Sequence, residues 1–443
     1  MTEQMKESGI QWIGAIPYNW NVERIKHIIQ CNDNGIKVGP FGSALTNEVV
    51  SSDEGKYKVY GQSNLIRKDF SYGDNYVSEQ NYKRLINYEV LPNDIAVSMM
   101  GTIGKCSVVP DNIEPGIMDS HLIKIRLSPK MLPRYFEYAY ESDMGYSQLL
   151  INSKGSIMNG LNSTIVKGLY IPVPEIIEQQ AIADYLDKEC AQIDSIAADL
   201  EKQIELLQQY KKSLITEAVT KGLDKSVPMK DSGVEWIGKI PEHWDVLRVK
   251  DISKLQTGTT PPGNEGVNFD NDGIQWFTPA DFNDGSIKLG LAEKSIDFAT
   301  IHRENIKAYP ANTVLFVGIA SIGKIGFSTN TCYSNQQTTG IKPNNDKNGK
   351  YIAYSLLAGM DGIKDNALYT TVPIINNAYL GNIKIPFPPA NEQETITKYL
   401  DYATSSVDEI IGKKLEQLST IRQHKNSLIY EYVTGKKRVK EVQ

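Results

Sequence analysis

The sequence predicts an α+β fold: two mixed α/β domains with short strands, joined by two long helices that form an antiparallel coiled coil, with an internal pseudo-two-fold repeat. Three observations predict it. A 23-residue segment occurs twice, a long heptad pattern closes each copy, and short apolar runs separated by Gly, Asn, Asp and Pro lie between.

The repeat spans the whole chain. Residues 6–28 (KESGIQWIGAIPYNWNVERIKHI) align without a gap on residues 230–252 (KDSGVEWIGKIPEHWDVLRVKDI), with 13 of 23 positions identical at an offset of 230 − 6 = 224. Residues 171–174 match residues 385–388 at an offset of 385 − 171 = 214. The chain therefore holds two copies of one domain-sized unit, and the second is 224 − 214 = 10 residues shorter.

Size and charge limit the class of protein. A chain of 443 residues is too long for a single core. The net charge is −6, and it is concentrated in residues 175–225, with 11 acidic and 6 basic side chains. Residues 26–174 carry 15 of each sign, and residues 250–388 carry 12 of each. Domains this neutral bind DNA weakly by charge alone, so if the ligand is DNA we expect a basic partner to supply much of the phosphate contact.

The remaining composition indicates a cytoplasmic protein. We expect no membrane span, because no run of about 18 apolar residues occurs, and no signal peptide, because the first residues lack an apolar segment. The cysteines and histidines show no metal-ligand spacing, so free thiols and packing or surface imidazoles are expected. They are Cys31, Cys106, Cys190 and Cys332, and His27, His121, His243, His302 and His424.

Each copy opens with the pattern W-I-G-x-I-P-x-x-W, residues 12–20 and 236–244. Pro17 and Pro241 exclude a helix interior. We expect an extended segment whose tryptophans anchor it to a core. Mixed short-strand regions follow, and the predicted boundaries are residues 1–174 for the first domain, 175–225 for the first long helix, 226–388 for the second domain and 389–443 for the second long helix.

Each copy closes with a heptad helix. The first helix repeats apolar residues at intervals of seven, with companions on the same face: Leu186, Ile193, Leu200, Leu207 and Leu214, then Ile182, Ile196 and Tyr210. The second keeps this register, interrupted by Lys414: Leu400, Val407, Ile421 and Leu428, with Ile396, Ile410, Leu415 and Leu418 adding apolar surface. The seams favour pairing of the two helices with each other, and pairing with another protein is the alternative.

A glycine turn that presents a lysine occurs in both copies. Residues 318–324 have the P-loop spacing, but Ile325 replaces the Ser or Thr that holds Mg²⁺, and the first copy lacks the first glycine. Nucleotide hydrolysis is therefore not expected. A strand followed by [ST]-Ile-Gly-Lys suits a phosphate contact, and a β-turn with a solvent lysine is the alternative. The candidates are Thr102, Gly104, Lys105, Ser321, Gly323 and Lys324.

Polar loops differ between the copies. Their side chains can contact bases or phosphates, and ordinary polar turns are the alternative. The candidates are Ser120, His121, Asn159, Asn162 and Ser163 in the first copy, and Gln336, Gln337, Thr338, Thr370 and Thr371 in the second. No catalytic or methyltransferase motif occurs in the sequence. One scaffold with two specificities is the interpretation that fits this divergence.

The start of each long helix shows the pattern P-x-P…E-Q…Y-L-D. The matching residues are Pro172, Pro174, Glu178, Gln179, Tyr185, Leu186 and Asp187, and Pro386, Pro388, Glu392, Gln393, Tyr399, Leu400 and Asp401. With the opening segments and the two variable domains, this pattern resembles the specificity subunit of Type I restriction-modification enzymes. The resemblance extends over essentially the whole chain, although none of its motifs is specific alone.

The resemblance implies a non-enzymatic subunit with two target-recognition domains, each reading half of a bipartite site in double-stranded DNA. It implies helices that set the gap and dock two modification subunits. S-adenosylmethionine, ATP and Mg²⁺ are then expected only on modification and restriction partners. Candidate partner-binding residues are Glu178, Gln179, Tyr185, Glu392, Gln393 and Tyr399. The alternative function is a coiled-coil adaptor holding two protein or ligand partners.

Overall fold

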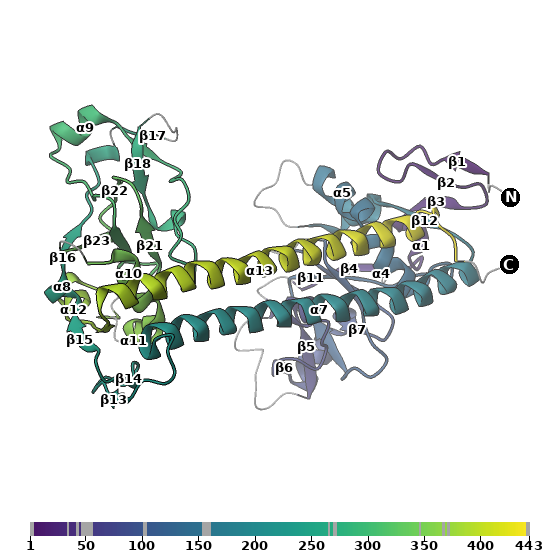
Figure 1. The fold of residues 1–443 in the computed structure, drawn as a ribbon. Helices are drawn as coiled ribbons and strands as arrows, with labels where there is room; N and C mark the ends of the chain where they lie inside the picture. Colours follow the sequence, from purple (N-terminus) through teal and green to yellow (C-terminus); the bar gives the residue numbers. More distant parts are fainter. Residues whose placement is uncertain are drawn as a thin grey trace. The chain divides into compact units, whose positions relative to one another are not determined.

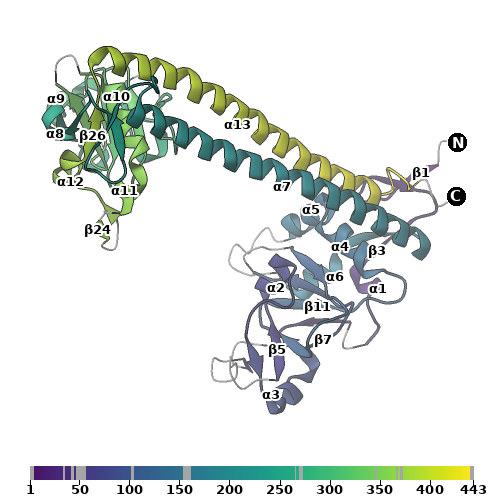
Figure 2. The same ribbon diagram turned by 60° about the horizontal axis from the view of Figure 1, so that its bottom comes forward.

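A computed structural model describes residues 4–32, 35–40, 44–45, 56–100, 104–152, 161–264, 266–268, 273–344, 347–365, 368–369 and 373–439. The chain divides into unit 1 (residues 1–199 and 417–443) and unit 2 (residues 200–416). Each unit contains one mixed domain and a part of both long helices, α7 (Ile176–Lys221) and α13 (Ala390–Val433) (Figures 1 and 2).

In unit 1 the described strands form two four-stranded sheets and two strand pairs. The first sheet has the order β4 (Ile36–Val38), β11 (Leu122–Ile125), β8 (Ile95–Ser98) and β9 (Cys106–Val108). The second has the order β6 (Tyr76–Val77), β5 (Tyr57–Tyr60), β10 (Gly116–Met118) and β7 (Glu89–Val90), with β5 and β10 parallel. The pairs are β1 (Met5–Glu7) with β2 (Ala15–Pro17), and β3 (Asn21–Arg24) with β12 (Tyr170–Val173).

The described residues of unit 1 also form six short α-helices. They are α1 (Ile25–Ile28), α2 (Gln62–Arg67), α3 (Glu79–Arg84), α4 (Pro133–Glu141), α5 (Asp143–Asn152) and α6 (Ser163–Gly168). Pro133 occupies the first turn of α4, where its missing N–H would have no helical partner. The core combines α4, the β8–β11 sheet and α7, with Tyr135, Phe136 and Leu186 fully buried.

Unit 2 repeats this layout. Its sheets have the orders β16 (Ser253–Thr257), β23 (Thr338–Pro343), β20 (Thr313–Val317) and β21 (Ile325–Ser328), and β17 (Val267–Asn268), β19 (Ser295–Ile296), β18 (Ile274–Phe277) and β22 (Tyr333–Ser334), with β18 and β22 parallel. The pairs are β13 (Met229–Asp231) with β14 (Lys239–Pro241), β15 (Asp245–Arg248) with β26 (Lys384–Phe387), and β24 (Leu368–Tyr369) with β25 (Pro373–Ile374).

The short α-helices of unit 2 are α8 (Val249–Ile252), α9 (Phe298–Arg303), α10 (Gly349–Ala358), α11 (Met360–Asp365) and α12 (Asn377–Asn382). The order β16-β23-β20-β21 reproduces β4-β11-β8-β9, and α10 packs on this sheet as α4 packs on its counterpart. The duplication therefore extends through the core sheets, where the two sequences have little in common.

The opening tryptophans anchor each copy, as predicted. Trp20 and Trp244 are fully buried. Each indole N–H donates to a carboxylate at the start of the long helix of its own copy, over 2.9 Å from Trp20 to Glu178 and 2.9 Å from Trp244 to Glu392. These bonds tie the first segment of each copy to the helix that closes it.

Within each unit the long helices lie side by side and run in opposite directions (Figure 1). In unit 2, Lys211 pairs with Asp408 at 2.6 Å, and Lys414 donates to Gln203 at 2.5 Å, so numbers rise on one helix as they fall on the other. In unit 1, Lys425 pairs with Asp194 at 2.6 Å. The two ion pairs are related by the repeat, since 194 + 214 = 408 and 211 + 214 = 425.

The heptad residues face inward, but two predicted companions do not. Leu186, Leu200 and Leu400 are buried, whereas Ile196 and Tyr210 are 51% and 58% exposed, which corrects the expectation for those two. In a heptad the spacing between inward-facing positions alternates between three and four residues. On α7 the second buried position lies four residues after each heptad leucine, not three. The buried residues at this position include Cys190, Ile204 and Lys211. On α13, Ile410 and Leu415 are likewise exposed.

Candidate nucleic-acid interface

The loops with candidate residues meet at one point in unit 1. There backbone hydrogen bonds join the residue after β8, the turn between β10 and β11, the residue after β4, the last residue of β5 and Leu161. We call this set of bonds junction 1: Met99 N–H to His121 O (2.9 Å), Gly39 N–H to Leu122 O (2.8 Å), Asp119 N–H to Tyr60 O (2.8 Å) and Leu161 N–H to Met99 O (2.8 Å).

Unit 2 forms the same junction from different residues. Junction 2 consists of Gly318 N–H to Gln337 O (2.9 Å), Gly258 N–H to Thr338 O (2.9 Å), Asn335 N–H to Phe277 O (3.2 Å) and Ile375 N–H to Gly318 O (2.8 Å). Each bond has its counterpart in junction 1. The turn at residues 119–121 is therefore equivalent to the turn at residues 335–337. Each turn ends one residue before an inner strand of its sheet, β11 in unit 1 and β23 in unit 2.

A glycine makes each junction possible. A Cβ on Gly39 would lie 1.7 Å from the carbonyl oxygen of Asp119, and a Cβ on Gly258 would lie 2.2 Å from that of Asn335. Both distances are far below van der Waals contact with a backbone atom, so these positions exclude other residues unless the turn moves.

The predicted lysines follow equivalent turns beside the junctions. Gly104 and Gly323 have φ of 85° and 94°, the left-handed conformation that glycine adopts readily. The Lys105 side chain is 53% exposed, and its Nζ lies 3.8 Å from a Glu141 oxygen. Lys324 is half-buried, and its Nζ donates to the Pro279 carbonyl over 3.4 Å. Ser321 is exposed in the same turn.

In junction 1 the turn places an imidazole beside a carboxylate. The His121 backbone N–H donates to Asp119 Oδ1 over 2.8 Å, and His121 Nδ1 lies 3.4 Å from Asp119 Oδ2. Burial raises the pKa of the Asp119 carboxyl, and the hydrogen bonds from His121 oppose this shift. The His121 side chain is 50% exposed, and Ser120, between them, is half-buried.

In junction 2 the turn carries amides. The Gln337 backbone N–H donates to Asn335 Oδ1 over 3.1 Å, and Asn335 Nδ2 donates to Gln337 Oε1 over 2.9 Å. Gln336 is exposed and accepts a hydrogen bond from the Thr260 hydroxyl. Thr338 was also a candidate, but its side chain is fully buried in β23, so a direct DNA contact is excluded.

The remaining loop candidates are only partly described. Asn162 is exposed, but its side-chain oxygen caps α6 by accepting the Ile165 N–H over 2.9 Å, and Ser163 is the first residue of that helix. The equivalent Asn376 (162 + 214 = 376) caps α12 in the same way. Thr102, Asn159, Thr370 and Thr371 lie outside the described residues.

Two polar residues at the junctions were missed by the sequence analysis. Gln62, directly after Gly61, donates to Ser98 Oγ (2.7 Å) and to the Met100 carbonyl (2.6 Å). In junction 2, Asn377 accepts from the Thr339 hydroxyl, and its amide donates to the Thr257 hydroxyl, each over 2.9 Å. The signal for Gln62 was a polar residue and a glycine immediately after a short apolar run.

The predicted partner-binding residues mostly support their own domains. Gln179 is fully buried, and its amide bonds Leu132 N–H, Lys130 O and Pro174 O. Gln393 is 2% exposed and donates to Pro388 O. Glu178, 7% exposed, accepts from Trp20 and pairs with Arg438. Burial excludes direct partner contacts by these three side chains, which corrects the expectation.

The other three partner candidates are more accessible. Glu392 is half-buried and also bonds His243 over 2.8 Å. The Tyr185 ring lies against that of Tyr432, with centroids 4.5 Å apart, and the hydrogen bond between the two tyrosines raises the pKa of Tyr185 to about 12. Tyr399 is 42% exposed and is the most accessible member of this predicted set.

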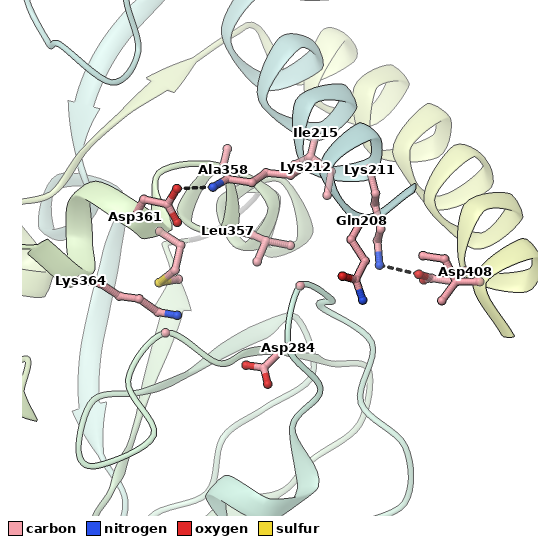
Figure 3. Close-up of a pocket in the computed structure, with 14 residues that line it drawn as sticks. Gln208, Lys211, Lys212, Ile215, Asp284, Leu357, Ala358, Asp361, Lys364 and Asp408 are labelled. Carbon is pink, nitrogen blue, oxygen red and sulfur yellow. Dashed lines mark hydrogen bonds and ion pairs between the residues drawn. The ribbon is translucent and has the colours of Figure 1, made fainter. Parts of the chain in front are cut away.

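A cavity of about 420 Å³ lies in unit 2 between α7, α13, α11 and the Gly323 turn. Three lysines and three aspartates line it. Figure 3 shows two ion pairs among them, Lys212 with Asp361 and Lys211 with Asp408, while Lys364 and Asp284 are drawn without such an interaction. Matched charges of this kind do not form an anion site or a catalytic constellation.

In the part of the chain that the structure describes, no cluster of three or more His, Cys, Asp or Glu side chains is arranged to hold a metal ion. Over the same residues, no helix combines the length and apolar character needed to cross a membrane.

Comparison with known proteins identifies the family. The family model described as "Type I restriction modification DNA specificity domain" matches residues 20–206 and 241–420. A protein of Methanocaldococcus jannaschii assigned as the MjaX specificity subunit of a type I restriction enzyme is 25% identical over 444 residues, covering 97% of this chain and 96% of that protein. The EcoBI specificity subunit of Escherichia coli is 28% identical over 252 residues, 54% of this chain and 50% of that protein.

A solved structure supports the same fold. It is described as "Structural basis underlying complex assembly and conformational transition of the type I R-M system" and matches with a TM-score of 0.69 at 16% identity, covering 94% of this chain and 98% of that one. The two matched segments each contain one junction and the start of one long helix. The chain belongs to the type I restriction modification DNA specificity family, with two copies of the specificity domain and the recognition function of that family.

Proposed function

We propose that each domain reads one half of a bipartite DNA site through the residues at its junction. The observation that carries this proposal is the pair of junctions. The same backbone bonds hold Asp119, Ser120 and His121 in one domain and Asn335, Gln336 and Gln337 in the other. Identical frameworks with different hydrogen-bonding side chains suit two domains that read different bases.

The long helices form an antiparallel coiled coil that sets the gap between the half-sites and docks two modification subunits. The opposed direction of the helices within each unit and the repeat-related Lys–Asp pairs support this pairing. Exposed apolar side chains on the helices, among them Ile196, Ile410 and Tyr399, offer contact surface to such partners. Methylation and cleavage, with their S-adenosylmethionine, ATP and Mg²⁺, are functions of those partners.

Selection from random-sequence DNA tests the recognition proposal. The full chain with its modification subunits should enrich a split consensus, read by sequencing. Absence of any enriched sequence would contradict the proposal and favour an adaptor that holds two other partners.

A domain exchange tests whether each domain reads independently. Residues 253–384 are replaced by the equivalent residues 29–170 of the first domain, chosen from the strands that frame each domain. The hybrid should read the first half-site twice, in inverted orientation. A consensus identical to that of the unaltered chain would refute independent reading.

Insertion of one heptad in each helix, near Leu200 and Lys414, tests the role of the helices. A heptad preserves the apolar seam and lengthens each helix by about 10 Å at 1.5 Å per residue. The preferred gap should lengthen while both half-site sequences stay the same. If the half-sites change and the gap does not, the helices do not set the spacing.

A further inference from the structure

The two junction turns share an arrangement of side chains that the backbone bonds alone do not require. In each turn the first residue is an Asx: Asp119 or Asn335. Its Oδ1 accepts the backbone N–H of the residue two places on, and its second terminal atom faces that residue's side chain. The facing side chains are His121 and Gln337, which we call the reading side chains.

We propose that the Asx of each junction is a positioning residue. It decides whether the reading side chain presents a hydrogen-bond donor or an acceptor to a base edge in DNA. Asp119 does this for His121, and Asn335 does it for Gln337. The inference rests on the proposed function and adds to it the chemical class of base that each position accepts.

In junction 2 the hydrogen-bond chemistry has a single solution. The backbone N–H of Gln337 must meet an acceptor, so the Asn335 atom that it bonds is Oδ1. The remaining atom, Nδ2, is a donor and engages Gln337 Oε1 at 2.9 Å. Among the described residues nothing engages Gln337 Nε2, so Gln337 presents a donor. A donor suits N7 or O6 of guanine, N7 of adenine or O4 of thymine.

In junction 1 the same logic gives the opposite result. An ionised carboxylate has no proton to donate, so Asp119 Oδ2, 3.4 Å from His121 Nδ1, favours the tautomer with a proton on Nδ1. The Ser120 hydroxyl, 3.5 Å from the same Nδ1, can accept as well as donate and is compatible with this tautomer. In this tautomer Nε2 carries no proton, and no described residue engages it. His121 therefore presents an acceptor. An acceptor suits the amino groups of adenine N6 or cytosine N4.

The turn geometry holds the positioning residue in place. Asn335 is 8% exposed, and the Asp119 side chain is 26% exposed, whereas the His121 side chain is 50% exposed. Gly61 leaves room for the Asp119 carboxylate, because a Cβ there would lie 2.7 Å from Oδ2. In junction 1 the Asx is thus more buried than the reading side chain, and in junction 2 the half-buried Gln337 is likewise more accessible than the buried Asn335.

Reciprocal exchanges test the inference. In Asn335→Asp a carboxylate replaces the amide, so Gln337 should turn its Nε2 inward and present Oε1, an acceptor. In Asp119→Asn the new Nδ2 should donate to His121 Nδ1 and move the ring proton to Nε2, which becomes a donor. Each exchange should shift base preference about tenfold at one position of its own half-site, from acceptor-bearing to amino-bearing bases for Asn335→Asp and the reverse for Asp119→Asn.

The assay is selection from random DNA, scored as base preference at each position, with the full chain and its modification subunits. A uniform affinity loss from the added charge does not alter such preferences. Gln337→Glu provides a second route, because its carboxylate accepts from Asn335 and presents an acceptor without changing the turn. Gln337→Glu and Asn335→Asp should select the same base, and the first half-site should stay unchanged in both.

A double variant separates positioning from direct contact. If Asn335 acts through Gln337, Asn335→Asp should leave base preference unchanged when Gln337→Ala is already present. An equal shift in that background would overturn the inference, because Asn335 would then read the base itself. The inference would also be overturned if Asn335→Asp and Gln337→Glu both kept the base preferences of the wild-type chain. A wild-type chain that selects no split consensus would refute the proposed function itself, an outcome distinct from either of these.

Discussion

Removing Lys324 tests the electrostatic side of DNA binding. Its Nζ donates to the Pro279 carbonyl over 3.4 Å, and within the described residues no carboxylate forms an ion pair with it. The full positive charge is therefore available to a phosphate beside junction 2. Lys324→Ala should weaken binding to cognate and random DNA about equally, since a phosphate contact carries little sequence information.

The magnitude follows from counterion release. One phosphate contact contributes about 0.9 to the slope of log affinity against log salt concentration. Between about 50 and 200 mM salt, the advantage of the unaltered protein over Lys324→Ala should therefore shrink about 3.5-fold. Lys105→Ala should change the slope in the same direction but less, because the Glu141 carboxylate, 3.8 Å from Lys105 Nζ, offsets part of its charge.

Affinity measured by fluorescence anisotropy at three salt concentrations, on cognate and random duplexes, gives the slope directly. Lys254→Ala is the matched control, because Lys254 is exposed near the end of β16 that is remote from Gly258. It should leave the slope unchanged. If neither Lys324→Ala nor Lys105→Ala alters the slope, the phosphate assignment is wrong; a lower melting temperature with an unaltered slope would instead indicate a structural role.

Three further substitutions test the scaffold by thermal and chemical denaturation. Trp244→Phe removes the 2.9 Å bond to Glu392 and should lower stability by about 1–2 kcal/mol. Asp408→Asn leaves the ammonium of Lys211, whose side chain is 10% exposed, without its ion pair and should lower stability by about 1–3 kcal/mol, with high salt reducing this effect little. Gly435→Ala, at φ 70° with a Cβ 2.4 Å from a Pro17 side-chain atom, should destabilise by about 1–3 kcal/mol. No loss of stability in any one variant would contradict the corresponding contact.

The sequence predicted the features that depend on long or repeated patterns. The repeat was visible in the opening segments, and the structure buries Trp20 and Trp244 as expected. It also predicted a long helix closing each copy, now α7 and α13. It misassigned Ile196 and Tyr210, because a list of apolar residues at intervals of seven does not say whether the companion face lies three or four residues away.

The junctions could not be predicted from sequence. Their bonds join backbone atoms of residues far apart in the chain, such as Gly39 with Leu122, and backbone bonds leave no side-chain signature. The core strands are only three to six residues long and share little sequence between copies. The candidates His121 and Gln337 were found as polar loop residues, but their equivalence appears only when the two sets of backbone bonds are compared.

The use of backbone hydrogen bonds at both junctions also explains how one fold can carry two different recognition specificities. The carbonyl of His121 and that of Gln337 accept the same bond, from Met99 and Gly318, so the turn is held whatever side chain follows. The tightest side-chain restrictions at the two junctions, among the described residues, fall on Gly39 and Gly258, where a Cβ would strike the backbone of the turn. Under the proposed function, substitution of a reading side chain would change the hydrogen-bonding group offered to DNA while every backbone bond of the junction is kept. Specificity can diverge between the copies while the framework that presents it stays the same.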